Sequence, residues 1–120
     1  MLFWAKSSQS MDRSKGHVQD IIDAIVLIKE HTDALTSRDF IDEKNVLIQN
    51  LAMRQLGIIG EATKKLSKNI YDSNPDIPWH EIAGMRNRLI HEYDNVDLYV
   101  VWQTITESLP ALAKALQEYV

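Results

Sequence analysis

Apolar residues recur at spacings of three and four along most of this chain, and this periodicity restricts the fold more than any other feature of the sequence. From Val18 onward, Ile21, Ile25 and Ile28 place a continuous apolar stripe on one face of a helix. These branched residues would also suit a strand, but the stretch is too long and its spacing too helical for one. We therefore expect a first long helix from about Val18.

A second segment with the same spacing contains two glycines. This long helix is expected to start near residues 41–45 and to run towards Ser67, with Gly57 and Gly60 inside it. Each glycine weakens a helix by about 1 kcal/mol relative to alanine, so the pair indicates close approach of another backbone or of a substrate. Tight helix packing is the favoured explanation. A third helix is expected to begin at Pro78, whose missing N–H is tolerated in a first turn.

A fourth helix is expected from a cap at Asp94-Asn95 to the end of the chain. Pro110 lies inside its apolar pattern and cannot donate a backbone hydrogen bond, so a kink or break is expected near Ser108. No segment shows the alternation of a strand. The expected fold class is all-α, an up-and-down bundle of four main helices with short extra helical turns near residues 37–40.

The expected helices form one domain that follows a short tail. Residues 1–15 lack periodicity and are expected to form a flexible N-terminal tail, which leaves residues 16–120 as a single helical domain. Cysteine is absent, which excludes disulfides and thiolate sites and makes a reducing cytoplasm the expected location. No apolar run approaches the roughly 20 residues that a membrane-spanning helix needs, so no membrane association is expected.

The charge balance limits the kind of nucleic-acid contact that the chain can make. Thirteen Lys and Arg residues against 17 Asp and Glu residues give a formal net charge of -4. This balance counts against a protein that coats nucleic acid through a broad basic surface. An enzyme that engages a few phosphates in one cleft remains compatible with it, so any RNA contact is expected to be local.

The segment from Arg86 to Tyr93 concentrates the candidate functional residues. On a helix that turns about 100° per residue, Arg86 and Tyr93 border the apolar face. Asn87 and His91 are four residues apart, are therefore neighbours on the helix surface, and point nearly away from that face. A lone histidine is most often an ordinary side chain, but this direction leaves His91 either solvated or facing a second molecule.

The run Arg86-Asn-Arg-Leu-Ile-His-Glu-Tyr93 resembles the R-x-x-x-x-H-x-Y signature of HepT toxins, which belong to the HEPN superfamily of small helical ribonucleases. The polar residue directly after the arginine also fits that superfamily. The resemblance extends to Ile59-Gly-Glu-Ala62, to the turn Asn74-Pro-Asp-Ile-Pro-Trp79 and to the helix of residues 97–109. It covers roughly residues 17–118 and implies a HEPN-like bundle. These elements in this order are far more specific than an isolated R-x-x-x-x-H.

The resemblance implies a metal-independent endoribonuclease that needs no cofactor and acts on RNA, either tRNA or mRNA. Imidazole exchanges protons near neutral pH, so His91 can take the proton of a ribose 2′-OH or give one to the leaving 5′-oxygen. Arg86 can stabilise the anionic phosphorane, while Asn87 can orient His91 or donate to phosphate. The reaction uses both a base and an acid, and each chain offers one such histidine. A homodimer is therefore expected, with a composite site like that of HEPN enzymes.

For Tyr93 the resemblance implies AMPylation by an MNT-type nucleotidyltransferase, the antitoxin of a type VII toxin–antitoxin pair. Nucleotide phosphates added beside Arg86 and His91 would occupy the positive site and repel RNA. The alternative for Tyr93 is an aromatic residue at the edge of the core. Glu61 is a supporting candidate that can pair with Arg86, or else is an ordinary solvated glutamate, and Arg88 is a candidate phosphate contact.

Other functions have less support in the sequence. His80 and His91 lie too far apart on one helix to share an ion and no carboxylate spacing assists them, so no metal site is expected. A Gly-rich phosphate loop, an H-E-x-x-H pair and a nucleophile elbow are all absent. The alternative function is a non-catalytic helical partner of a nucleotidyltransferase, in which the same motif binds nucleotide or phosphate. A purely structural helical dimer is a third hypothesis.

Overall fold

The computed structural model describes the backbone of residues 2–120 and the side chains of residues 14–120, and this part of the chain is helical with no strand. The α-helices are α1 (Leu2–Thr32), α2 (Ser37–Ile41), α3 (Val46–Thr63), α4 (Lys68–Ser73), α5 (Trp79–His91), α6 (Leu98–Gln103) and α7 (Leu109–Leu116). Single turns of other helix types are η1 (Glu43–Asn45), η2 (Tyr93–Asn95), η3 (Thr104–Ser108) and η4 (Gln117–Tyr119). The predicted all-α class is confirmed.

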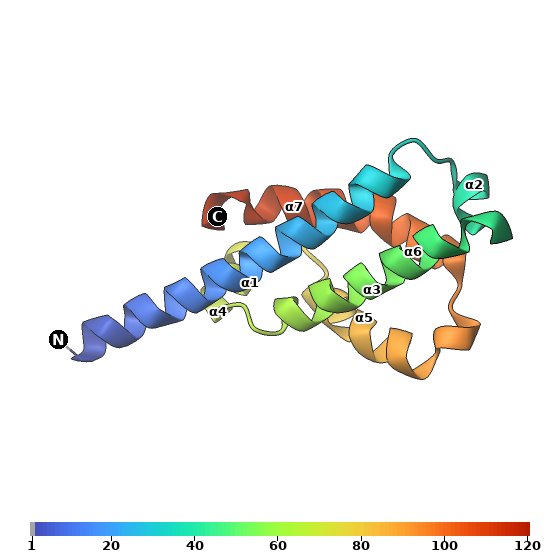
Figure 1. The fold of residues 1–120 in the computed structure, drawn as a ribbon. Helices are drawn as coiled ribbons and strands as arrows, with labels where there is room; N and C mark the ends of the chain where they lie inside the picture. Colours follow the sequence, from blue (N-terminus) through green and yellow to red (C-terminus); the bar gives the residue numbers. More distant parts are fainter. Residues whose placement is uncertain (1) are drawn as a thin grey trace.

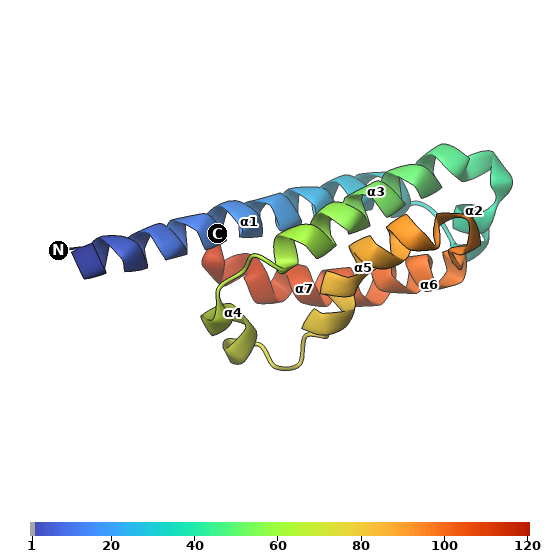
Figure 2. The same cartoon turned by 90° about the horizontal axis from the view of Figure 1, so that it is seen from below.

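Four long members alternate in direction along the bundle (Figure 1). They are α1, α3, α5 and the continuous run from α6 through η3 to α7, and α3 packs against both α1 and α5. The run from α6 to α7 covers the remaining side of α1 and α3 (Figure 2). The up-and-down, HEPN-like bundle expected from the sequence is therefore the observed architecture, with α2 and α4 as its short extra helices.

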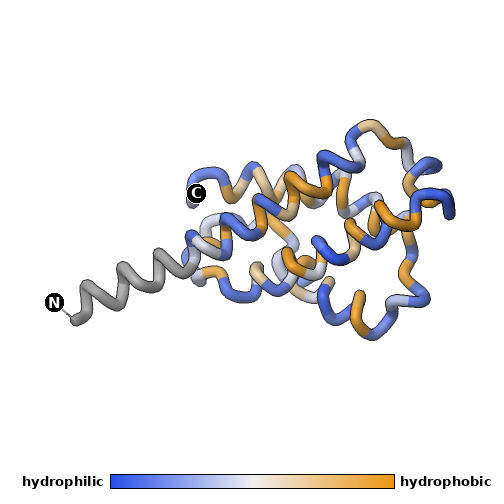
Figure 3. Tube along the Cα trace, viewed as in Figure 1, coloured by the Kyte–Doolittle hydropathy of each residue, from blue (hydrophilic) through white to orange (hydrophobic). Residues whose placement is uncertain are grey.

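The core lies where the predicted apolar stripes meet, and hydrophobic positions concentrate on the facing sides of the helices (Figure 3). Buried members of the stripes include Val18, Ile21, Ile28, Leu56, Ile59, Ile82, Val101, Leu109 and Leu112. Gln49 is also buried, and the cost of burying its amide is offset because the amide donates to the carbonyls of Phe40 and Asp42 at the end of α2. None of the described helices is long and apolar enough to cross a bilayer.

The first helix begins earlier than the sequence predicts. Its backbone is helical from Leu2, whereas the apolar stripe starts at Val18. Ser14 is buried and its hydroxyl accepts a hydrogen bond of 3.1 Å from the Ser67 N–H at the start of α4. Ser14 thus packs with the domain although it falls inside the predicted tail of residues 1–15. Flexibility of that tail stays a prediction.

The second long helix ends at Thr63 rather than near Ser67. The next backbone N–H groups turn back to Gly60, Ala62 and Thr63 in the tight bonds that close a helix end. The hydroxyl of Tyr71 then donates to the Thr63 carbonyl, which satisfies a terminal acceptor. Tyr71 belongs to α4, so a short helix that the sequence did not predict directly precedes the turn of residues 74–79.

The fourth helix differs from prediction at its start and agrees in its interior. The expected cap at Asp94-Asn95 is wrong, since η2 occupies those residues and the Asp97 carboxylate caps α6 by accepting from the Tyr99 N–H at 2.9 Å. The irregularity expected near Ser108 is present as η3, a π-helical turn that does not break the helical run, and Pro110 follows it in the first turn of α7. That position suits a residue without an N–H.

Candidate active site

Gly60 sets how closely α5 approaches α3. A Cβ atom built on Gly60 would lie 2.9 Å from the Ile82 carbonyl oxygen and 3.2 Å from the Arg86 backbone nitrogen. Backbone contacts this short leave no room for a side chain, so the predicted tight helix packing is confirmed at Gly60. A Cβ on Gly57 would meet nothing within 4 Å, and Gly57 instead lines an open cleft.

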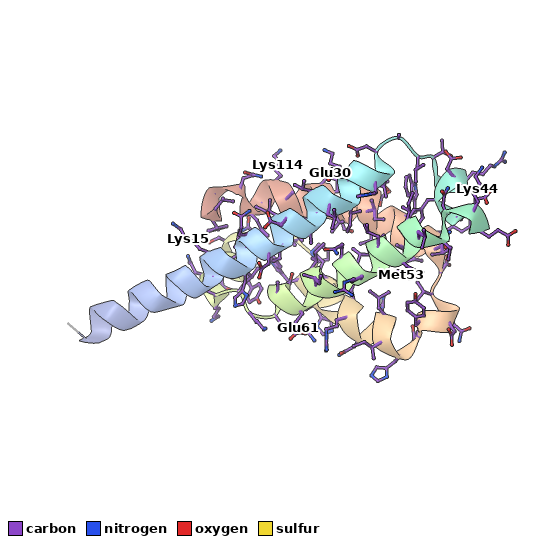
Figure 4. The ribbon with its side chains drawn as sticks, in the orientation of Figure 1. Lys15, Glu30, Lys44, Met53, Glu61 and Lys114 are labelled. Atoms are coloured by element: carbon purple, nitrogen blue, oxygen red, sulfur yellow. The ribbon has the colours of Figure 1, made fainter. Side chains whose placement is uncertain are left out.

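Arg86 is held at this close crossing by an ion pair with Glu61. The Arg86 Nε atom lies 3.5 Å from Glu61 Oε2, and 46% and 41% of the two side chains are exposed. Glu61 lies near the carboxyl end of α3, beside α5 (Figure 4). An ion pair this exposed contributes about 0–1 kcal/mol, so an incoming phosphate can compete for the guanidinium. The pairing predicted for Glu61 is present.

Tyr93 lies against α3, two residues beyond the end of α5. Its hydroxyl donates a hydrogen bond of 2.6 Å to the side-chain oxygen of Asn50, while 51% of Tyr93 remains exposed. The bond anchors η2 on the amino-terminal half of α3. Asn50 is a site residue that sequence reasoning missed, because nothing local to either residue indicates a partner 43 positions away.

A cleft of about 780 Å³ runs between α1, α3 and α5 and joins these features. Arg86, Glu61 and Tyr93 all line it, together with the partly exposed apolar residues Ile58 and Ile90. The helical projection of the sequence placed Arg86 and Tyr93 at the border of one helix's apolar face, but α5 ends at His91 and Tyr93 begins η2. The structure brings both side chains to one cleft, where Arg86 supplies a cation and Tyr93 an exposed aromatic ring.

Asn87 and His91 are exposed and do not line that cleft. His91 is the last residue of α5, and on a helix it lies about 140° around the axis from Arg86 and about 7.5 Å along it. Arg86 is turned towards α3 while His91 faces away from it. The predicted outward direction of Asn87 and His91 agrees with their exposure, and one chain does not gather Arg86 and His91 in one cleft.

Arg88 belongs to a different surface. It lines a smaller cleft of about 340 Å³ between α5 and α6, near the carboxylate residues Glu92 and Asp97. The structure therefore does not bring Arg88 together with Arg86. Its supporting role stays a prediction, and acidic neighbours disfavour a phosphate there.

Within the described side chains, no group of three or more His, Cys, Asp or Glu residues gathers closely enough to hold a metal ion. The side chains that the structure does gather at α5 are a guanidinium, a carboxylate, a carboxamide and a phenol. Together they can bind an anion and exchange hydrogen bonds with it. The imidazole of His91, exposed at the end of the same helix, supplies a proton-transfer group.

Comparison with known proteins identifies the family. The family described as Ribonuclease HepT-like matches residues 21–119. A protein of Thermococcus cleftensis named "Probable ribonuclease HepT" is 43% identical over 103 residues, covering 85% of this chain and 92% of that protein. A protein of Caldanaerobacter subterraneus named as a putative RNase is 34% identical, and the match covers 90% of this chain and 95% of that protein. A protein of Methanocaldococcus jannaschii named as a putative RNase is 36% identical, and the match covers 88% of this chain and 86% of that protein. No solved structure matches. Because the matched span contains α5 and every candidate residue, the chain belongs to the HepT-like ribonuclease family.

Proposed function

We propose that this protein is a metal-independent endoribonuclease toxin that cleaves RNA in the cytoplasm with Arg86, Asn87 and His91. The observation that carries the proposal is the placement of this motif on α5. The guanidinium lies at a cleft on one side of the helix, and the amide and imidazole are exposed on the other. Membership of the HepT-like ribonuclease family supports the same activity.

The cleavage chemistry follows from these side chains. One His91 imidazole takes the proton of a ribose 2′-OH, whose oxygen attacks the adjacent phosphorus. The bond from phosphorus to the 5′-oxygen breaks, a protonated imidazole donates a proton to that oxygen, and a 2′,3′-cyclic phosphate and a 5′-hydroxyl result. Arg86 stabilises the charge of the phosphorane, and Asn87 holds either His91 or a phosphate oxygen.

A homodimer supplies the two imidazoles that this reaction uses. Because Arg86 and His91 face different directions on one α5, a second copy placed against the exposed side of the helix supplies the missing group. Twofold symmetry brings the same helix to meet its copy, so two copies of the motif line one active site. A strictly monomeric form that cleaves RNA at the full rate would contradict this arrangement.

Regulation is assigned to Tyr93 and a partner MNT-type nucleotidyltransferase, as in type VII toxin–antitoxin systems. In AMPylation, the Tyr93 oxygen attacks the α-phosphate of ATP, pyrophosphate leaves and the phenolic proton is released. The hydroxyl already lies in the cleft that Arg86 lines, so an attached AMP adds negative charge beside that guanidinium. RNA is then repelled from the site.

The activity is tested with purified protein, tRNA and mRNA in the presence of EDTA. Cleavage is expected with the wild type and is expected to be lost in Arg86→Ala and His91→Ala, with His31→Ala and Arg38→Ala as exposed controls outside the site. Circular dichroism verifies folding, and intact mass verifies that the wild type carries no AMP. Absence of cleavage by unmodified, folded wild type would overturn the proposal.

The modification is tested by incubating the protein with the cognate antitoxin and ATP. Intact mass is expected to increase by AMP groups in the wild type and in Tyr99→Phe, which changes a tyrosine that is also more than half exposed, but not in Tyr93→Phe. Unchanged adenylylation of Tyr93→Phe would refute the assignment.

A non-catalytic partner of a nucleotidyltransferase is the alternative function. The cleft beside Arg86 favours it, since a cation next to an exposed aromatic ring also suits a bound nucleotide without cleavage. This alternative predicts that unmodified protein binds AMP or RNA while every preparation leaves RNA intact. The EDTA cleavage experiment therefore separates the two functions.

A further inference from the structure

The α3 side of the cleft carries cations that the Arg86 motif does not include. Arg54 and Lys65 both line the cleft and are both exposed. Among the side chains that the structure describes, neither forms an ion pair, whereas Arg86 is paired with Glu61. The two cations are thus available to a ligand. They stand out because the whole chain has a formal net charge of -4.

Their spacing along α3 places them on both sides of Arg86. Glu61 marks the position of Arg86 on α3, and Arg54 lies seven residues before it, a rise of about 10.5 Å. Lys65 lies just past the carboxyl end of the helix, on the other side of Glu61. A phosphate bound at Arg86 is therefore flanked by one cation in each direction along the cleft. Such a row suits a chain of phosphates better than a single anion.

The wall of the cleft beside these cations is apolar and aromatic. Tyr93, Ile90 and Ile58 are 51%, 56% and 40% exposed and all line it. Proteins that bind single-stranded nucleic acid combine an aromatic surface for the bases with cations along the backbone. A volume of about 780 Å³ also lies in the range of small-molecule and cofactor sites.

The cleft keeps a positive formal charge after the carboxylates that line it are counted. Asp20 and Glu61 also line it, and Glu61 is neutralised by Arg86. The remaining formal charges are two cations, Arg54 and Lys65, against Asp20, which gives a net charge of +1. The excess is small and local, so the attraction to phosphate depends on these two side chains rather than on the surface as a whole.

We infer that this cleft is a subsite for single-stranded RNA, in which Arg54 and Lys65 contact the phosphates on either side of the one at Arg86, and a base lies against the ring of Tyr93. The inference rests on the proposed ribonuclease function for its source of RNA. It adds a binding surface that selects an unpaired strand, because a base can reach the ring only when it is free of a duplex. No base sequence is selected by stacking.

The subsite is tested by binding rather than by cleavage. A short 2′-O-methyl RNA strand with a fluorescent label is titrated with protein, since it lacks the 2′-OH that cleavage uses. Arg54→Ala and Lys65→Ala are each expected to weaken binding about fivefold. Each is also expected to reduce the slope of log K against log salt by about 0.7. The matched controls are Arg38→Ala and Lys114→Ala, which lie outside the cleft and are expected to bind as the wild type does.

Two variants of Tyr93 distinguish base stacking from hydrogen bonding as contributions to RNA binding in the same titration. Tyr93→Ala is expected to weaken binding at least about fivefold, because stacking of a base on an aromatic ring contributes about 1–3 kcal/mol. Tyr93→Phe keeps the ring and is expected to retain the wild-type affinity. Both cations and the ring are exposed, so these changes leave the buried core intact.

The outcomes distinguish this subsite from the proposed catalytic function. Arg54→Ala and Lys65→Ala binding as tightly as their controls would overturn the subsite, even if unmodified RNA is cleaved and His91→Ala abolishes that cleavage. Weakened binding in both variants supports the subsite even if the wild type cleaves nothing, in which case the ribonuclease proposal fails alone. No saturable binding by the wild type would also overturn the subsite.

Discussion

Replacing Gly60 by alanine tests the packing that positions the candidate site. The added methyl group would lie 2.9 Å from the Ile82 carbonyl oxygen and 3.2 Å from the Arg86 nitrogen, both of them backbone atoms. Neither can move away by changing a rotamer, so α5 itself has to shift. Overpacking of this kind costs about 1–3 kcal/mol. The better helix propensity of alanine returns up to about 1 kcal/mol.

The net expectation for Gly60→Ala is a loss of up to about 2 kcal/mol in the free energy of unfolding, or a fall in Tm of up to several degrees. Gly57→Ala is the matched control on the same helix, because its Cβ meets nothing within 4 Å and only the propensity gain of up to about 1 kcal/mol remains. Gly60→Ala should therefore be less stable than Gly57→Ala by about 1–3 kcal/mol, the overpacking cost that only Gly60 has.

The assay is urea unfolding followed by circular dichroism at one fixed protein concentration, since association changes apparent stability. RNA cleavage by Gly60→Ala should also decrease, because Arg86 moves with α5. A Gly60→Ala protein as stable as Gly57→Ala would refute the reasoning that backbone contact at Gly60 fixes the distance between α3 and α5.

Three further predictions concern single side chains. Tyr93→Phe loses the hydrogen bond to Asn50 and should therefore lose at most about 1 kcal/mol in the free energy of unfolding. Its rate of metal-free RNA cleavage should stay that of the wild type. A large loss of that rate would contradict a regulatory role for Tyr93. Backbone and hydroxyl hydrogen bonds from Thr36 lower the pKa of Asp39 below 3.8, so the carboxylate stabilises the fold at higher pH and this stabilisation disappears as the pH falls through the lowered pKa. The stability difference between wild type and Asp39→Asn should therefore shrink in acid, and a constant difference would contradict the cause. Burial raises the pKa of Tyr71 above 10.0, so stability should fall as the pH rises above about 10, and an alkaline fall that persists unchanged in Tyr71→Phe would contradict this.

Much of the bundle follows from the sequence because helical periodicity is a local property. The stripes around Ile21 and Ile59 and the helix irregularity before Pro110 depend on residues a few positions apart, and the structure shows both, the irregularity as a π-helical turn. The pair of glycines in the second helix predicted a close contact, and the structure shows one at Gly60 but no such packing at Gly57. The projection of α5 also separated Arg86 from Asn87 and His91, because direction around a helix depends only on residue number.

Other features depend on contacts between distant segments, which periodicity does not encode. Asn50 and Tyr93 pair across 43 positions, and α3 ends at Thr63 partly because Tyr71 reaches back to its last carbonyl. The cap of α6 was misplaced by a few residues, since several acidic and amide side chains precede that helix and only the backbone path selects Asp97. The cleft itself is assembled from three helices and has no signature in any one of them.

One active site of the proposed dimer uses His91 from two chains, and a heterodimer tests this arrangement directly. A dimer of one wild-type chain and one His91→Ala chain, purified by two different tags, is assayed for RNA cleavage in EDTA. If both imidazoles serve one reaction, as base and as acid, the rate should fall about 100-fold or more, towards that of the His91→Ala homodimer. A heterodimer that keeps half of the wild-type rate would contradict the composite site, because each chain would then cleave RNA with its own His91.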